Sequence, residues 1–258
     1  WRAMKKGLEI QIPLLARLRD DNTIRIQTLS ETGKWYKDNY STTAPSAISA
    51  LTDYKNTGKK TVWYNSKYYR ANLFWEGNTF RFRDIHLFDE KFASDYIDEP
   101  GTTSTCRYTT LPFVDGNIWS SDNKLAGLRL FCARQDGTMV EATGRDPEIV
   151  HKGKRLYVRW PLEMPGTTFV MSFDEDKVRM QVESVGNTPM EWYMELSVVP
   201  GTVLPFTRIE NKHIDAREKM FDYKITCKKG TFADCKNTSG RIFRIKPENK
   251  EISISFKN

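Results

Sequence analysis

An alternation of apolar and polar residues, interrupted by turn sequences, runs from about residue 61 to the end of the chain. It is clearest after Leu125, in stretches such as "GLRLFCARQDGTMVEATG", "TTFVMSFDEDKVRMQVES" and "GRIFRIKPENKEISISF". Successive side chains of a strand point to opposite faces, so this pattern is typical of half-buried strands joined by short turns. We therefore expect a mainly β protein whose main body is an antiparallel β-sandwich of two large sheets.

The first part of the chain has a different pattern. Apolar residues recur every three or four positions, at Met4, Leu8, Ile12, Leu15 and Leu18. This spacing predicts one face of a helix, although Pro13 should kink or restart it. Ile24 and Ile26 then predict a short strand, and Thr28 with Glu31 has the capping-box spacing that begins a second helix. A lone parallel strand cannot cover both of its faces, so we interpret this segment as the remnant of an α/β domain. The alternative is that the helix and the strand simply pack on the residues that follow.

Composition divides the chain into three parts. Residues 1–40 form the α/β remnant, residues 41–60 form a linker rich in small and polar residues, and residues 61–258 form the sandwich. Within the linker, Ser46–Leu51 is expected to form one helical turn. The sequence starts at Trp1 with neither an initiator methionine nor an apolar signal segment, which predicts an excised or recombinant piece of a longer precursor.

Charge and cysteine content narrow the classes of function. The 40 basic residues exceed the 33 acidic ones but are scattered, so we do not expect nucleic acid as a partner. No apolar run approaches the roughly 18 residues that a membrane span needs. None of the four cysteines has CxxC spacing, which argues against zinc. Cys227 and Cys235, in "CKKGTFADC", form either a hairpin disulfide or two free thiols, and Cys106 and Cys132 are the other two.

The densest cluster of chemically active side chains is "RFRDIHLFDE". Strict alternation puts Asp84 and His86 on one strand face and Arg81 and Arg83 on the other. A carboxylate and an imidazole on one face can act as an acid/base pair or as metal ligands, and they can also form a purely structural hydrogen bond. We take Asp84, His86 and Asp89 as candidate catalytic residues. We expect no metal and no other cofactor, and no HxxxH, HExxH, GxSxG, P-loop or GxGxxG motif occurs.

Aromatic residues crowd the same region. They are Trp63, Tyr64, Tyr68, Tyr69, Phe74 and Trp75, with Trp119, Trp160 and Trp192 further along the chain. Flat aromatic faces stack on the C–H surfaces of sugar rings while neighbouring polar groups bind the hydroxyls, so this composition suits sugar recognition. Most of these residues should nevertheless belong to the core. We take Trp75, Arg83 and Trp119 as ligand contacts, together with Asp84 and His86.

The segment "LLARLRDDNTIRIQTLSETGKWYKD" resembles the closing segment of polysaccharide-deacetylase-like barrels, a broad group that includes related sugar-hydrolase barrels. In that group a late helix precedes a last strand, and "TLSETGKW" resembles the start of the terminal helix. The resemblance covers residues 8–40, and the Asp-Asp and His-x-x-x-His motifs of the group are absent from this chain. It implies a catalytic barrel upstream of Trp1, followed by an appended β domain similar to mutarotase-like supersandwiches.

These observations lead to an expected function. The chain is expected to be the C-terminal β-sandwich region of a longer, periplasmic or extracellular bacterial protein that acts on carbohydrates. That parent protein is expected to be a glycan hydrolase or deacetylase. It would support or line a site for an oligo- or polysaccharide without turnover of its own, with the upstream catalytic domain as its partner. One alternative is a self-contained glycoside hydrolase or lyase with Asp84 or Asp89 as acid or base. Another is a non-enzymatic surface interaction module.

Overall fold

The computed structural model describes residues 2–42, 44–97, 99–104, 109–185 and 190–257. Its contacts divide the chain into two units, Trp1–Thr43 and Ala44–Asn258, which are described separately. With 49% strand and 12% helix, the protein is mainly β. Among the described residues, no helix combines the length and the apolar content that crossing a membrane requires.

The first unit contains both predicted helices, α1 (Arg2–Asp20) and α2 (Leu29–Asn39). Helix α1 continues through Pro13 without a restart. The predicted strand through Ile24 and Ile26 is wrong, because residues 24–28 are in neither helix nor strand. A single strand without a partner leaves its backbone N–H and C=O groups unpaired, so a local period of two is not enough to make one.

The predicted capping box at the start of α2 is confirmed. The Thr28 side chain accepts a hydrogen bond from the Glu31 amide at 3.2 Å, and the Thr28 amide donates to Glu31 Oε2 at 2.7 Å. These two bonds satisfy backbone donors that have no partner inside the helix.

The second unit contains eighteen strands in the part of the chain that the structure describes. Their bounds are β1 (Ser46–Ala50), β2 (Lys59–Asn65), β3 (Tyr69–Glu76), β4 (Thr79–Leu87), β5 (Leu111–Asp115), β6 (Gly127–Ala133), β7 (Met139–Glu141), β8 (Glu148–Lys152), β9 (Arg155–Pro161), β10 (Thr167–Phe173), β11 (Lys177–Ser184), β12 (Trp192–Ser197), β13 (Phe206–Ile209), β14 (His213–Glu218), β15 (Phe221–Lys229), β16 (Thr231–Thr238), β17 (Arg241–Lys246) and β18 (Glu251–Ser255). The helical turn expected at Ser46–Leu51 is wrong, because Ser46–Ala50 forms β1 and pairs with β2.

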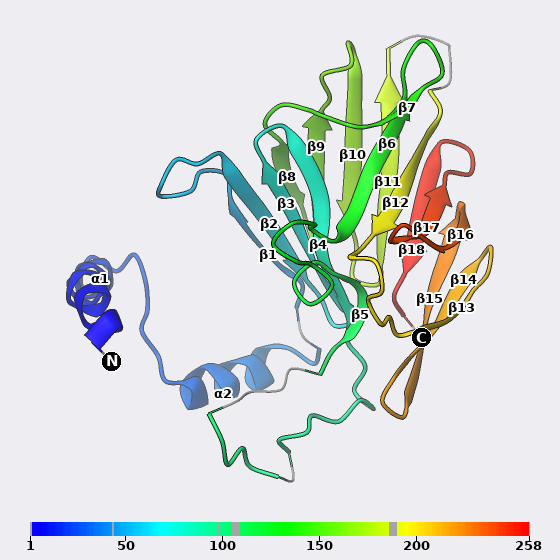
Figure 1. Cartoon of the computed structure of the whole chain (residues 1–258). Helices are drawn as coiled ribbons and strands as arrows, with labels where there is room; N and C mark the ends of the chain where they lie inside the picture. The colour runs from blue at the N-terminus through cyan, green and yellow to red at the C-terminus, as the bar shows by residue number, and fades with distance from the viewer. Residues whose placement is uncertain (1, 43, 98, 105–108, 186–189, 258) are drawn as a thin grey trace. The chain divides into compact units, whose positions relative to one another are not determined.

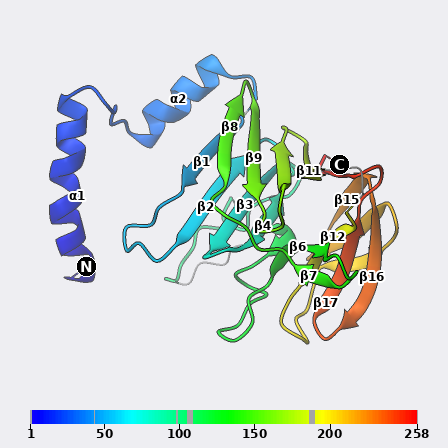
Figure 2. The same ribbon diagram turned by 90° about the horizontal axis from the view of Figure 1, so that it is seen from above.

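The strands form two antiparallel sheets, which confirms the predicted β-sandwich (Figure 1). The ten-stranded sheet has the order β1-β2-β3-β4-β6-β12-β17-β16, with β5 added beside β4 and β7 beside β6. The eight-stranded sheet has the order β13-β14-β15-β18-β11-β10-β9-β8. Figure 2 shows β8 and β9 of the second sheet beside β1, β2 and β3 of the first.

Aromatic side chains fill the space between the two sheets. Tyr64 on β2 contacts Phe173 on β10, with 5.5 Å between ring centroids, and Phe80 on β4 contacts Trp160 on β9 at 5.3 Å. All four side chains are buried in one hydrophobic core. Burial of large apolar surfaces from both sheets therefore holds the sandwich together.

A β-bulge in β4 determines which side chains leave this core. Asn72 of β3 pairs with Asp84, but the next residue of β3, Leu73, pairs with Phe82, so Arg83 is an extra residue. An inserted residue reverses the alternation beyond it. Ile85 consequently points into the core.

The bulge brings the two predicted faces of β4 together on one side. Arg81, Arg83, Asp84 and His86 line the same cavity, on the face of the ten-stranded sheet that points away from the core; we call this the outer face. The expectation that Arg81 and Arg83 lie opposite Asp84 and His86 is therefore wrong. A strict period of two cannot anticipate an inserted residue.

Strand β4 also has two different partners on its other edge. Its C-terminal half pairs with β5, with Asp84 opposite Asp115, whereas β6 pairs with β4 only through Phe82 and Leu128. The residues that connect β5 to β6 start at Gly116, whose amide donates to the Arg83 carbonyl at 2.6 Å. This connection therefore lies against β4 at the bulge and closes one side of the cavity.

Candidate functional site

A cavity with a volume of about 1050 Å³ lies on the outer face of the ten-stranded sheet. Its walls come from β3, from β4 and from the segment between residues 110 and 125. Its charged lining residues are Arg70, Arg81, Arg83, Asp84, His86, Asp115 and Asp122. We call this cavity the arginine pocket. Of the sequence-predicted site residues, Arg83, Asp84 and His86 are brought together here.

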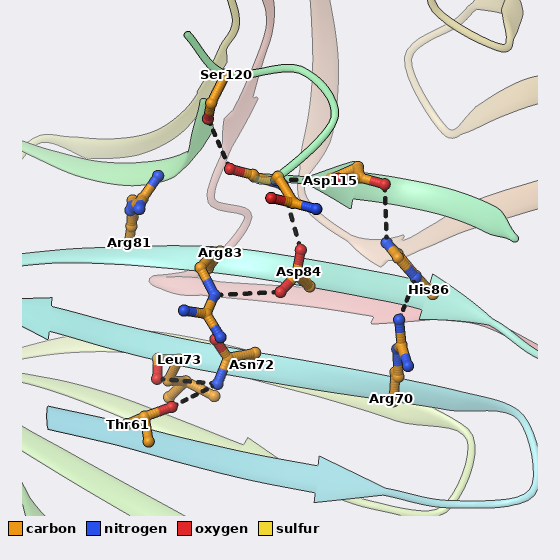
Figure 3. Close-up of polar contacts among 12 residues, drawn as sticks. Thr61, Arg70, Asn72, Leu73, Arg81, Arg83, Asp84, His86, Asp115 and Ser120 are labelled. Atoms are coloured by element: carbon orange, nitrogen blue, oxygen red, sulfur yellow. Dashed lines mark hydrogen bonds and ion pairs between the residues drawn. The ribbon is translucent and has the colours of Figure 1, made fainter. Parts of the chain in front are cut away.

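Two carboxylates stand side by side in the pocket because Asp84 and Asp115 are cross-strand partners. Both are buried, and like charges directly opposite one another destabilise a sheet unless they are compensated. Asp84 Oδ1 accepts a hydrogen bond from the Gly116 amide at 3.3 Å, and Oδ2 accepts one from Arg83 Nε at 3.3 Å. The charge of Asp84 is thus met by one backbone donor and one guanidinium group (Figure 3).

Asp115 is compensated mainly by its own loop. Its Oδ1 accepts hydrogen bonds from the amides of Asn117 at 3.0 Å and Ile118 at 2.7 Å, and its Oδ2 lies 3.5 Å from His86 Nε2. Burial by itself would raise the pKa of Asp115, but His86 and the two amides outweigh it and hold the pKa below its ordinary value of 3.8. Asp115 is therefore an anion at neutral pH.

The imidazole of His86 lies between Asp115 and Arg70. Arg70 Nη2 lies 2.9 Å from His86 Nδ1, and these two residues are cross-strand partners on β3 and β4. A guanidinium group has donors only, so Nδ1 must accept with its lone pair. The neutral ring therefore carries its proton on Nε2, which points toward Asp115 in Figure 3.

This tautomer bears on the question of a metal. One ligand atom from each of Asp84, His86 and Asp115 lies within 4.8 Å of the others, as the ligands of a cation would. A neutral histidine that binds a metal through Nε2 carries its proton on Nδ1, usually donating it to another group. Arg70 occupies Nδ1 as a donor, so the present arrangement of His86 differs from that of a metal-binding histidine.

Two half-buried aromatic rings support the arginines of the pocket. The Arg83 guanidinium lies over the Phe74 ring at 5.0 Å and over the Trp63 ring at 5.7 Å. Arg70 lies over Trp63 at 5.9 Å, and Arg81 over Phe74 at 5.6 Å. Such cation–π contacts fix the position of a guanidinium group without using its N–H donors.

The tryptophans expected to contact a ligand lie elsewhere. Trp75 is only 1% exposed and Trp119 only 4%, and both belong to the hydrophobic core. On β3 the inward positions are Leu73 and Trp75, so the residue between them, Phe74, takes the outer face. This corrects the prediction, since neither Trp75 nor Trp119 presents a ring face to solvent.

The remaining candidates do not join the pocket. Asp89 follows β4, and its Oδ1 accepts a hydrogen bond from the Lys91 amide at 2.9 Å, which makes it a turn residue. Cys227 and Cys235 are free thiols, so the hairpin disulfide is not formed. Cys106 lies outside the described residues.

Sequence reasoning missed Arg70 and Asp115, and it named Trp63 and Phe74 among the aromatic residues without selecting them as ligand contacts. Two of the four had a signal: Asp115-Gly116 is a turn sequence, and alternation could equally have put Trp75 in the core and Phe74 on the other face. Neither signal shows which strands become neighbours, because pairing between distant segments decides that.

The lowered pKa of Asp115 predicts how stability depends on pH. A carboxylate with a lower pKa in the folded state stabilises the fold above its unfolded pKa of about 3.9. That contribution is lost as the pH falls from about this value through the folded pKa. Asp115→Asn should remove this part of the acid sensitivity, which denaturant unfolding at a series of pH values would measure. Parallel curves for the two proteins would contradict the assignment.

A scan against protein-family models and a search of curated proteins found no match for this chain. The resemblance of residues 8–40 to polysaccharide-deacetylase-like barrels therefore has no support from known relatives.

Proposed function

We propose that residues 44–258 bind an oligosaccharide in the arginine pocket, as the β-sandwich region of an exported bacterial carbohydrate-active protein. The observation that carries this proposal is the pocket itself: a cavity of about 1050 Å³ with a densely polar lining on one sheet face. Small-molecule sites occupy about 300–1,000 Å³, so the pocket has room for more than a single small ion.

The lining suits a polyhydroxylated ligand. Sugar hydroxyls both donate and accept hydrogen bonds, and a site for them needs both kinds of partner in one place. The arginines supply donors only, Asp84 and Asp122 supply acceptors, and Asn117 and Ser121 can do both. Cross-strand pairing and the docked Gly116 loop hold several of these groups in position, which limits the entropy lost on binding.

Calorimetric titration of the whole chain with neutral and acidic oligosaccharides tests the proposal. Asn117 is exposed at the pocket and its backbone amide binds Asp115, so Asn117→Trp should block the pocket without removing that bond. The control is Val203→Trp, because Val203 is 92% exposed and does not line the pocket. We expect Asn117→Trp to abolish the heat of binding and Val203→Trp to leave it unchanged. The absence of heat with every sugar class would refute the proposal.

Hydrolysis is the second candidate function, because two carboxylates face the same cavity. Retaining glycosidases also use two carboxyl groups, about 5–5.5 Å apart, and ligand atoms of Asp84 and Asp115 lie within 4.8 Å of one another. Binding without turnover remains the stronger proposal, because both oxygens of Asp115 already face donors. A reducing-end assay separates the two functions: hydrolysis requires product release that Asp84→Asn abolishes, and binding alone gives none.

A further inference from the structure

We propose that the sugar in the arginine pocket carries an acidic group, a carboxylate or a sulfate, and that Arg81 and Arg83 bind this group. The inference rests on the proposed function and adds the chemical class of the ligand.

The pocket contains more guanidinium groups than its carboxylates neutralise by direct contact. Arg83 forms an ion pair with Asp84 at 3.3 Å. In the described part of the chain, Arg70 and Arg81 have no carboxylate within the 4.0 Å of an ion pair. The backbone amides of Gly116, Asn117 and Ile118 provide most of the donors to Asp84 and Asp115 instead.

Arginines elsewhere on the same sheet are treated differently. Arg129 on β6 forms an ion pair with Glu141 at 3.3 Å, and Arg244 on β17 forms one with Glu195 at 2.7 Å. Outside the pocket, these arginines of the ten-stranded sheet are therefore neutralised by an ion pair with a glutamate. Arg81 differs from them because it has no such ion pair in the described structure. We infer that an anion from a ligand binds there.

The positive charges in the pocket also disfavour one another. Burial lowers the pKa of Arg81 to about 10, and the charges of Arg129 and Arg83 contribute to the shift, which Glu76 and Asp84 offset only in part. Arg81 is still a cation at neutral pH, so this repulsion persists in the unliganded protein. A bound anion would reduce it, and a neutral sugar would not.

The aromatic rings leave the right donors available. Arg81 and Arg83 lie over the same Phe74 ring, at 5.6 and 5.0 Å from its centroid. A guanidinium group stacked on a ring keeps its N–H donors at its edge, where a carboxylate or sulfate can accept two of them in parallel. The Nε of Arg83 is used by Asp84 and one Nη of Arg81 by the Ala126 carbonyl, so the other Nη donors are those we assign to the ligand.

Paired ligands test the inference directly. We would titrate the whole chain with an oligogalacturonate and its methyl ester, and with a sulfated galactan oligosaccharide and its desulfated form. Each pair differs only in the acidic group. Charge-assisted hydrogen bonds contribute about 1.5–3 kcal/mol, so one acidic form should bind at least about tenfold more tightly than its neutral partner. Added salt should weaken that binding.

Substitutions locate the effect. Arg83→Gln should remove most of the preference for the acidic ligand, whereas Arg83→Lys should keep part of it through its charge. Arg208→Gln is the matched control, because it removes an equal charge from an exposed side chain on β13 of the other sheet. Thermal unfolding of each variant identifies any loss of the fold, and Arg81→Gln provides an independent second substitution within the pocket.

The outcomes separate the two proposals. Preference for the uronate or for the sulfated sugar, lost in Arg83→Gln and kept in Arg208→Gln, supports the inference and names the acidic group. Equal binding of acidic and neutral partners overturns the inference and leaves the proposed function intact. Failure of all four ligands and of the neutral panel to bind refutes both.

Discussion

Trp75→Ala is expected to lower the free energy of unfolding by about 3–5 kcal/mol, the usual cost of truncating a buried large aromatic side chain. Trp75 is 1% exposed, lies on β3 and contacts Phe80 with 5.1 Å between ring centroids. Its removal would leave a cavity in the core that rigid sheets on both sides cannot close. Denaturant unfolding monitored by circular dichroism would measure the loss.

Two control variants test whether the loss of stability in Trp75→Ala is caused by the lost side-chain volume and by the position of Trp75 on the core-facing side of β3. Trp75→Phe should be much less costly, because the Trp75 Nε1 has no hydrogen-bond partner in the described structure. Phe74→Ala, on the outer face, should destabilise less and should weaken glycan binding by removing the ring beneath Arg81 and Arg83. If Trp75→Ala kept wild-type stability but no longer bound sugar, the assignment of Trp75 to the core and of Phe74 to the outer face would be wrong.

Gly116→Ala should destabilise the protein by about 1–3 kcal/mol or more and should abolish glycan binding. A Cβ atom at this position would lie 2.5 Å from the Arg83 carbonyl oxygen, a backbone atom that cannot rotate away. The Gly116 amide also donates to that oxygen and to Asp84 Oδ1. The loop would therefore have to leave β4, and Asp115 would lose its position opposite Asp84.

A second glycine provides the matched control. A Cβ at Gly101 would lie 3.5 Å from the Tyr96 ring, an ordinary contact, so Gly101→Ala should be nearly neutral. Unfolding and calorimetric titration of both variants give the comparison. If Gly116→Ala kept both stability and binding, the close docking of this loop on β4 would be wrong.

Local patterns determined much of the fold. Alternation and turn sequences identify most strands after residue 61, because a half-buried strand needs an apolar residue at every second position. The Thr28 and Glu31 pair identifies the start of α2, because its hydrogen bonds span only three residues. The same local reasoning fails at residues 24–28, where the period of two is present but no partner strand is available.

Half of the candidate site could also be predicted. Asp84 and His86 share a face because both lie beyond the bulge, so the spacing of two between them still holds. Arg83 is the inserted residue and Arg81 precedes it. Strict alternation therefore predicts that both lie on the face opposite Asp84 and His86. The sequence of β4 has no marker for that insertion, which becomes visible only in the register with β3.

Sequence alone therefore determined the β-sandwich class, the capped helix and the location of Asp84 and His86 on one strand face. Each of these depends on residues that are only a few positions apart in the sequence. Tertiary structure decided the rest of the pocket. It placed Arg70 beside His86 and Asp115 beside Asp84 through strand pairing, and it chose Phe74 rather than Trp75 for the outer face. These arrangements depend on which strands pair, in which register, and on which face meets the second sheet, and all three are set by the packing of the whole sandwich.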